Sequence, residues 1–298
     1  MNWRRASLIA VPYLWLTALF LVPFFIVFKI SLSDVALSIP PYTPTLELSE
    51  GWSGLRDMLG QLDFDNFEFL TTDDLYWKSY LSSVKIAVIA TFFCLLVGFP
   101  IAYGMANAPT EWQPTLMLLV ILPFWTSFLI RVYSLIGLLS NEGMVNQFLM
   151  WTGLISEPLT ILNTNYAVYV GIVYTYCPFM ILPIYATLIK LDVSLLEAAE
   201  DLGCSRTEAF WRITVPLSKA GIIAGCFLVF IPALGEFVIP SLLGGSDTLM
   251  IGKVLYEEFF SNRDWPVASA VAVILLLILI VPIVLYQRNE QKMMEADQ

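Results

Sequence analysis

The sequence predicts an all-α integral membrane protein, with six transmembrane helices in a single domain over residues 1–298. Of its 298 residues, 58% are hydrophobic and 13% are charged, and the mean hydropathy is +0.76. A water-soluble domain cannot bury so much apolar surface, so we expect lipid to be the solvent. A membrane-spanning helix needs about 20 mostly apolar residues. The stretches that meet this condition are about 8–30, 82–105, 115–138, 166–189, 220–243 and 267–286.

The first stretch follows Arg4 and Arg5 and is longer than the apolar core of a signal peptide, so we interpret it as a retained span. The positive-inside rule favours two cytoplasmic termini. With the N-terminus inside, eight basic residues lie in inside segments and four in outside segments. The inside set is Arg4, Arg5, Lys190, Arg206, Arg212, Lys219, Arg288 and Lys292; the outside set is Arg56, Lys78, Lys253 and Arg263.

Several function classes are excluded by composition. The chain has no histidine, so imidazole ligands for metals, catalytic triads with histidine and imidazole proton relays are excluded. The four cysteines have no C-x-x-C spacing, and they predict neither a disulfide framework nor a zinc site. The net charge is −10, and no dense basic cluster is present that could follow a phosphate backbone, so nucleic acid is not an expected partner.

The outside loop 31–80 carries nine acidic residues against two basic ones. Such a surface can attract cations. It is also typical of an ordinary solvated face or of a docking site for a periplasmic protein.

The inside loop 190–219 predicts a helix, a sharp turn and a second helix. Ser194 with Glu197, and Ser205 with Glu208, have the spacing of capping boxes. Gly203 supplies a residue that can end the first helix in a left-handed conformation. An amphipathic loop helix lying on the membrane surface explains this pattern equally well.

The spacing Glu-Ala-Ala-x3-Gly-x9-Ile-x2-Pro in this loop resembles the EAA loop of binding-protein-dependent ATP-binding-cassette (ABC) importers. The matching residues are Glu197, Ala198, Ala199, Gly203, Ile213 and Pro216. The resemblance implies a type I ABC importer permease fold, in which Glu197 through Gly203 form the coupling helix that docks on a separate ATP-binding subunit, expected in two copies. The chain has no G-x-x-x-x-G-K-[ST] motif, so we expect no enzyme activity of its own and no bound cofactor, with ATP and Mg on the partner.

Further segments resemble the permease subunits of spermidine and putrescine importers of the PotB/PotH type. They are Ile39-Pro-Pro-Tyr42, Leu122 to Arg131, Ala233 to Pro240, Leu242 to Gly245 and Asn262 to Ala270. The resemblance implies a multi-pass protein of the bacterial inner membrane, surrounded by lipid, that carries polyamine, with putrescine as the expected cargo. It also implies a second, homologous permease subunit and a periplasmic polyamine-binding protein.

Two charged residues, Arg131 and Glu236, lie well inside apolar spans, away from the span ends. A charge there costs about 2.5–3.5 kcal/mol on insertion scales and usually faces a cavity or a partner. Glu236 lies between Pro232 and Pro240, where an interrupted helix can border a water-filled path and the carboxylate can meet the ammonium of a diamine. Alternatively Arg131 and Glu236 pair with each other, either structurally or as a gate.

Trp125, Tyr133, Tyr174 and Tyr176 are candidates for cation–π contact with an alkylammonium, although aromatic residues in membrane helices more often serve packing. Competing functions are an importer permease for another small solute and an ion-coupled secondary transporter. The second leaves the EAA-like loop without a role, and the sequence has no visible inverted repeat.

Overall fold

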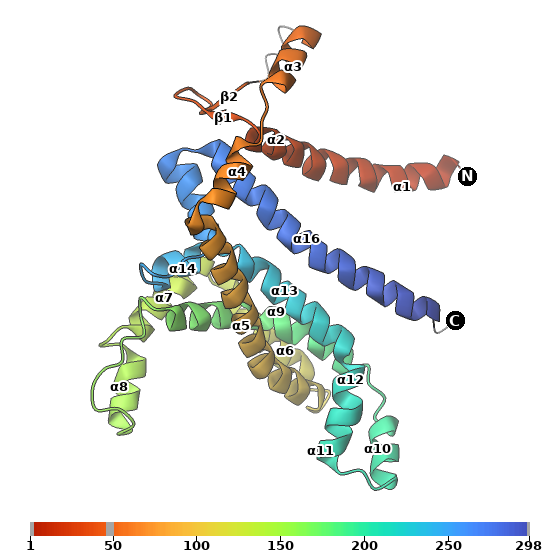
Figure 1. Cartoon of the computed structure of the whole chain (residues 1–298). Helices are drawn as coiled ribbons and strands as arrows, with labels where there is room; N and C mark the ends of the chain where they lie inside the picture. The colour runs from red at the N-terminus through yellow and green to blue at the C-terminus, as the bar shows by residue number, and fades with distance from the viewer. Residues whose placement is uncertain (1–2, 46–50, 297–298) are drawn as a thin grey trace. The chain divides into compact units, whose positions relative to one another are not determined.

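Long apolar helices dominate the structure, a computed structural model that describes residues 3–45 and 51–296 (Figure 1). A helix satisfies its backbone hydrogen bonds within itself, which is why apolar runs in a membrane protein fold in this way. Within the described residues the only strands are β1 (Asp34–Val35) and β2 (Tyr42–Thr43), which pair antiparallel. The all-α prediction is confirmed, with this short hairpin as an addition. Two acidic residues of the outside loop, Glu47 and Glu50, lie outside the described residues.

The chain divides into two compact units. The first contains Met1–Tyr80 and Val254–Gln298, and the second contains Leu81–Lys253. Helix α5 (Asp74–Ala106) contributes residues to both.

Among the described residues, four helices are long and apolar enough to cross a membrane on their own. They are Leu8–Ser31, Asp74–Ala106, Phe128–Trp151 and Asn165–Leu188. A fifth span results if Arg206–Leu217 and Lys219–Leu234, which meet at a bend of 63°, are counted together. Gln113–Trp125 and Trp265–Ile280 are shorter apolar helices, so the count of six stays a prediction.

In the first unit, a nearly continuous helix precedes the hairpin. The elements are α1 (Trp3–Leu16), a π-helical turn (Thr17–Leu21), α2 (Val22–Ser31), α3 (Gly51–Gly60), α4 (Asp65–Thr72), a second π-helical turn (Glu257–Asn262) and α16 (Trp265–Ala296). Helix α16 packs against α2 and α4. The Asn66 side chain donates to the carbonyls of Ser31 and Ser33 at 3.1 and 2.8 Å, which fixes α4 to the end of α2.

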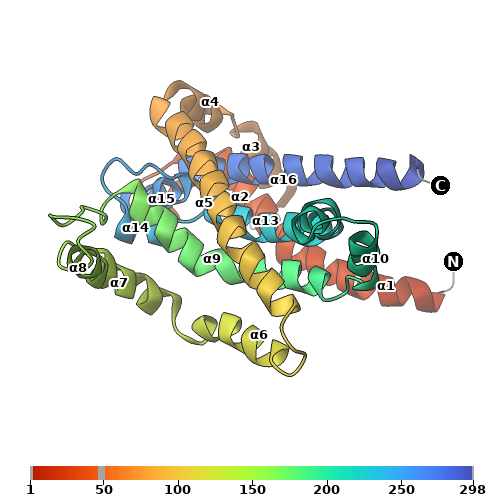
Figure 2. The same cartoon turned by 90° about the horizontal axis from the view of Figure 1, so that it is seen from below.

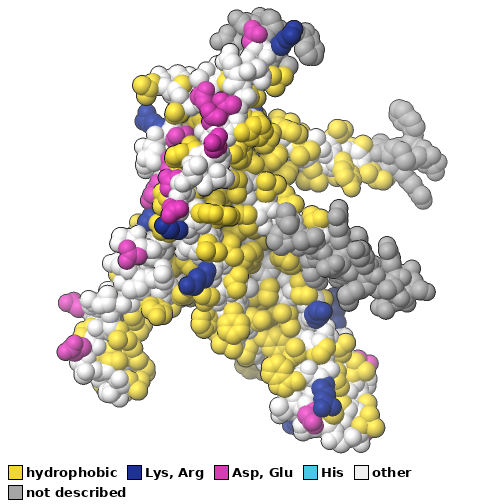
Figure 3. Space-filling view, in the orientation of Figure 1, with side chains coloured by type: hydrophobic (Ala, Val, Ile, Leu, Met, Phe, Trp, Pro, Cys, Tyr) yellow, Lys and Arg dark blue, Asp and Glu magenta, His cyan; other side chains and the backbone are white. Residues whose placement is uncertain are grey.

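Figure 3 shows acidic side chains over α4 and the start of α5, where Asp65, Glu68 and Asp74 are exposed. Further along α5, exposed side chains such as Phe92 and Leu96 are apolar. Exposed apolar side chains on a helix of this length are typical of contact with lipid.

The second unit begins in α5 and contains the two candidate functional segments. Its other elements are α6 (Gln113–Ile121), a 3-10 turn (Leu122–Trp125), α7 (Phe128–Leu139), α8 (Met144–Trp151), α9 (Asn165–Leu188), α10 (Ser194–Asp201), α11 (Arg206–Ala209), a π-helical turn (Phe210–Thr214), α12 (Val215–Leu217), α13 (Lys219–Leu234) and α14 (Val238–Leu243). Helix α15 (Ile251–Tyr256) contributes residues to both units. The predicted third span, 115–138, is divided at Thr126 and Ser127, where Thr126 has extended backbone angles. The predicted fifth span is divided at Gly235 to Phe237.

Helices α9 and α13 form the main helix pair of this unit, and Figure 2 shows α5 crossing α9. Gly221 and Gly225 are four residues apart on the face of α13 that meets α9. Small residues at this spacing let two membrane helices approach closely. A Cβ atom added at Gly225 would lie 3.1 Å from the Met180 carbonyl oxygen and 3.3 Å from Met180 Cα, so glycine allows the two backbones to approach closely here.

Replacing Gly221 with alanine should destabilise the chain. The new Cβ would lie 2.6 Å from the Pro183 carbonyl oxygen and 3.0 Å from Ile184 Cα, and backbone atoms of a packed helix cannot move aside cheaply. Overpacking of this kind costs about 1–3 kcal/mol, so the apparent Tm in detergent should fall. The control is Gly104→Ala on α5, where the added Cβ meets nothing within 4 Å and the Tm should hold or rise. Equal Tm values for the two variants would contradict this account of the α9–α13 contact.

Candidate functional site

The loop 190–219 contains two short helices, α10 and α11, joined by a tight turn. Figure 1 shows them next to each other, beyond the ends of α9 and α13. Gly203 has φ of +86°, so its left-handed conformation is confirmed. Its N–H donates to the Glu200 carbonyl at 2.9 Å, and the Cys204 N–H donates to the Ala199 carbonyl at 2.9 Å. This pair of bonds is a Schellman motif, which closes the end of α10.

The capping box predicted at Ser205 and Glu208 is confirmed. Glu208 N–H donates to Ser205 Oγ at 3.3 Å, and Ser205 N–H donates to Glu208 Oε2 at 3.1 Å. Together with the Schellman motif, this box fixes both sides of the turn, so the loop has a defined shape without a partner.

The capping box predicted at Ser194 and Glu197 is wrong. Val193 occupies the N-cap with helical backbone angles, so Ser194 is already the first helical residue and its side chain makes no capping bond. Asp192 serves the helix start instead, because its Oδ1 accepts from the Ser194 N–H at 3.0 Å. This hydrogen bond favours the ionised form and holds the pKa of the Asp192 carboxyl below its usual value.

The loop presents an apolar tip and is packed at its base. Leu202, next to the turn, is 88% exposed, whereas Ala199 is buried. At the base, the Phe210 ring packs edge-on against Phe99 and Tyr103 of α5, with ring centroids 5.7 and 5.3 Å apart. An exposed leucine on a rigid, protruding helical hairpin is suited to insertion into a groove of another protein.

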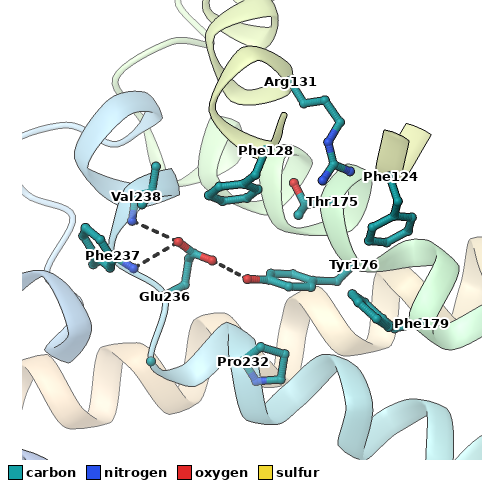
Figure 4. Close-up of a pocket in the computed structure, with 11 residues that line it drawn as sticks. Phe124, Phe128, Arg131, Thr175, Tyr176, Phe179, Pro232, Glu236, Phe237 and Val238 are labelled. Carbon is teal, nitrogen blue, oxygen red and sulfur yellow. Dashed lines mark hydrogen bonds between the residues drawn. The ribbon is translucent and has the colours of Figure 1, made fainter. Parts of the chain in front are cut away.

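The second candidate site is a pocket of about 530 Å³, which we call the Arg131 pocket (Figure 4). It lies where the third and fifth predicted spans are interrupted. Its lining residues are Phe124, Phe128, Arg131, Thr175, Tyr176, Phe179, Pro232, Gly235, Glu236, Phe237 and Val238.

Glu236 holds the start of α14 from within this pocket. Its Oε1 accepts from the backbone N–H groups of Phe237, Val238 and Ile239 at 3.1, 2.9 and 3.3 Å. Its Oε2 accepts from the Tyr176 hydroxyl. The first N–H groups of a helix have no partner within the helix and favour a negative charge. Because the helix is interrupted at Gly235–Phe237, the Glu236 carboxylate, which is 7% exposed, caps the N-terminus of α14.

Arg131 lies on α7 and is also 7% exposed. Its guanidinium lies over the Phe124 ring, with Cζ 5.0 Å from the centroid. Among the described residues, no acidic oxygen lies within 4.0 Å of it, so Arg131 and Glu236 do not form an ion pair with each other in this structure. The two charges share a pocket without neutralising each other directly.

Of the predicted path residues, the structure brings Arg131, Glu236 and Tyr176 together. It places Trp125, Tyr133 and Tyr174 outside the pocket lining, with exposed fractions of 74%, 58% and 44%. These three stay candidates for surfaces of the path that the pocket does not include.

Sequence reasoning missed the aromatic walls, which come from Phe124, Phe128 and Phe179. The available signal was Pro123, because proline disfavours a continuous helix; the extended Thr126 follows it, and a new helix begins at Phe128. Phe124 and Phe128 lie on either side of this helix break, and that placement could have identified them as walls of a cavity.

Comparison with known proteins places the chain in a family. Residues 7–295 match the family described as binding-protein-dependent transport system inner membrane component. The spermidine/putrescine transport system permease protein PotB of Escherichia coli K12 is 44% identical over 224 residues, which are 75% of this chain and 81% of PotB. PotB of Haemophilus influenzae is 44% identical over 214 residues, 72% of this chain and 75% of that protein.

Solved structures with the same fold come from ABC importers of other solutes. A chain of a bacterial transporter of the acidic polysaccharide alginate has a TM-score of 0.64 at 17% identity, covering 97% of this chain and 96% of that one. A chain of the methionine transporter MetNI has a TM-score of 0.53 at 16% identity, covering 75% and 96%. At this identity the likeness shows the fold alone, and it confirms the predicted permease fold.

The family consists of membrane components of transport systems, and several apolar helices make this chain a multi-pass protein of the inner membrane. Its task is transport, and it is a permease component rather than the ATP-hydrolysing subunit. The chain belongs to the family of binding-protein-dependent transport system inner membrane components.

Proposed function

We propose that this chain is the permease subunit of a bacterial ATP-driven polyamine importer, with putrescine as its cargo. The identity of 44% with spermidine/putrescine permeases over three quarters of the chain carries the choice of cargo class. The partners are an ATP-binding subunit in two copies, which holds ATP and Mg, a second homologous permease subunit and a periplasmic polyamine-binding protein. Both termini lie in the cytoplasm.

The segment from Glu197 to Gly203 is the coupling helix, with Ala198, Ala199, Ile213 and Pro216 completing the docking loop. Its exposed Leu202 enters a groove of the ATP-binding subunit. Closure of two ATP-binding subunits pushes the loop, and the contact of Phe210 with Phe99 and Tyr103 passes the movement to α5. The membrane helices respond by exchanging outward and inward access.

The Arg131 pocket forms part of the cargo path. The rings of Phe124, Phe128 and Tyr176 offer faces that attract an alkylammonium by cation–π interaction. The Glu236 carboxylate supplies a negative potential close to these rings. These groups attract a dication more strongly than a neutral solute of similar size, and they act against the repulsion from Arg131 in the same pocket.

The test is uptake of radiolabelled putrescine by cells that lack their own polyamine importers. The chain is expressed with its presumed partner subunits, and unlabelled spermidine, putrescine and amino acids serve as competitors. We expect uptake that requires ATP hydrolysis, is blocked by polyamines and is absent when the ATP-binding subunit is omitted. Uptake that persists without the ATP-binding subunit would point to an ion-coupled transporter. A complex that assembles but takes up no polyamine would show that polyamine is not the cargo.

A further inference from the structure

Helix α15 contacts the backbone of the Gly235–Phe237 interruption at Gly252. A Cβ atom added at Gly252 would lie 2.4 Å from the Gly235 carbonyl oxygen and 2.7 Å from the Glu236 carbonyl oxygen. Ordinary van der Waals contact of a Cβ atom begins at 3.4 Å. Glycine is the residue that lets one backbone approach another so closely. The contact between α15 and the interruption therefore depends on the missing side chain.

This contact lies outside the lining of the Arg131 pocket, because Gly252 is not among the lining residues. Within the pocket, Glu236 Oε1 accepts from the three N–H groups that begin α14, and its Oε2 accepts from the Tyr176 hydroxyl on α9. The interruption is thus held by its carbonyl groups against α15 and by its carboxylate against α14 and α9. The position of the carboxylate depends on both sets of contacts.

The start of α15 is fixed and cannot easily move away from the interruption. The Ile251 N–H donates to Ser83 Oγ of α5 at 2.7 Å, and both residues are buried. Met250 and Ile251 are 0% exposed. Just before them, Thr248 Oγ1 donates to Asn165 Oδ1 at the start of α9, at 2.8 Å. Extra volume on this part of α15 would therefore displace the interruption and not α15.

Helix α14 is also packed too tightly to follow such a displacement. Its Ile239 and Leu243 are 0% exposed, and a Cβ atom added at Gly171 of α9 would lie within 2.8 Å of both side chains. A methyl group on α15 would have to move the Gly235 carbonyl oxygen from 2.4 to 3.4 Å, about 1 Å. The N–H bonds to Glu236 Oε1 are already 2.9 to 3.3 Å long, and the usual range ends at about 3.2 Å. These bonds would take up the shift.

We propose that Gly252 is a positioning residue for Glu236, and that its contact with the interruption sets where the carboxylate lies in the Arg131 pocket. The inference rests on the proposed function, in which this carboxylate meets the cargo. Gly252→Ala keeps every charge of the pocket and shifts the carboxylate relative to Tyr176. In an enzyme, a displacement of about 1 Å caused by a distant substitution can cost about 100-fold in rate. A change outside the pocket thus reaches the cargo through the backbone.

The concentration dependence of putrescine uptake by the assembled complex separates positioning from general destabilisation. Gly252→Ala should raise the apparent KM about tenfold or more. The matched control is Gly221→Ala, whose Cβ would lie 2.6 Å from the Pro183 carbonyl oxygen, away from the pocket lining. Both variants should lower the Tm, and the control should keep the KM of the wild type. Equal KM values for the two variants would overturn the proposal.

A double-mutant cycle tests whether Gly252 acts through the carboxylate. Substitutions that act on one shared interaction are not additive, whereas independent ones are. Gly252→Ala introduced together with Glu236→Gln should therefore change the KM by a smaller factor than Gly252→Ala does in the wild type. The same factor in both backgrounds would show that Gly252 affects uptake independently of Glu236, and the positioning role would be wrong.

Hydrogen–deuterium exchange, measured by mass spectrometry without cargo, gives a readout that does not depend on transport. The amides of Phe237, Val238 and Ile239 are the donors to Glu236, so Gly252→Ala should speed the exchange of the peptide that contains them about tenfold or more. Ser83→Ala loosens the same link without adding an atom, because it removes the acceptor of the Ile251 N–H, and should speed this exchange as well.

The exchange measurement also separates this proposal from the proposed function. Unchanged exchange in both the Gly252→Ala and the Ser83→Ala variants would overturn the positioning role. Faster exchange in these variants, combined with no polyamine uptake even by the wild-type complex, would show that polyamine is not the cargo and would keep the link between Gly252 and Glu236.

Discussion

Replacing Gly203 with valine should uncouple polyamine uptake from ATP hydrolysis and reduce uptake about tenfold or more. The residue has φ of +86°, a conformation that costs a residue with a Cβ atom roughly 1–2 kcal/mol, and more when the side chain is β-branched. A Cβ atom at this position would meet nothing within 4 Å, so the expected effect comes from the backbone and not from a clash. The Schellman motif would open, and Leu202 would lose its fixed position at the tip.

Uptake, ATPase activity and recovery of the ATP-binding subunit are measured on the same preparation. The matched control is Gly203→Asn, because asparagine tolerates the left-handed conformation and should keep most of the uptake. If the valine variant transports and assembles as the wild type does, the coupling role of the segment from Glu197 to Gly203 is wrong.

Replacing Glu236 with glutamine should reduce putrescine uptake by about tenfold or more without loss of the chain from the membrane. Glutamine keeps an oxygen for the backbone N–H groups of α14, but it removes the negative charge that the proposed dication meets and weakens three charge-assisted hydrogen bonds. A loss of roughly 1–3 kcal/mol is expected for a charged acceptor in a buried site.

Tyr176→Phe is the companion variant, because it removes one hydrogen bond to Glu236 and keeps the charge. It should retain much more uptake than the glutamine variant. Rescue of the Glu236→Gln variant by Arg131→Met would favour a functional pair between the two residues, and we expect no rescue, because the structure gives them no direct contact. Equal uptake by the phenylalanine and glutamine variants would assign Glu236 a purely structural role.

The sequence allows the fold to be predicted where the signal is local. Lipid as solvent follows from composition, the long helices follow from apolar runs, and the turn at Gly203 follows from the special conformations open to glycine. The capping box at Ser205 was predictable for the same reason. The error at Ser194 arose because two residues compete for the start of α10, and the spacing to Glu197 does not reveal that Asp192 binds the Ser194 N–H.

The pocket was predictable only in part, because its parts come from distant segments. The proline-bounded stretch around Glu236 indicates an interrupted helix, and Arg131 is conspicuous as a charge in an apolar run. Whether the two residues touch depends on the crossing of α7, α9 and α14, which no local pattern encodes. In the structure, the Glu236 carboxylate accepts hydrogen bonds from the backbone N–H groups that follow it. The Nε and Nη1 atoms of the nearby Arg131 have no hydrogen-bond partner in the described structure.

The ring contacts of Phe210 join the loop 190–219 to Phe99 and Tyr103 in the C-terminal half of α5. Neither Phe210 nor its neighbours Phe99 and Tyr103 lies at the exposed loop tip or in the Arg131 pocket. Under the proposed function, a movement of the loop reaches α5 through three aromatic rings that lie at neither proposed binding surface. If that function holds, changes in ring size at these positions should alter the coupling of ATP hydrolysis to transport without altering either binding surface.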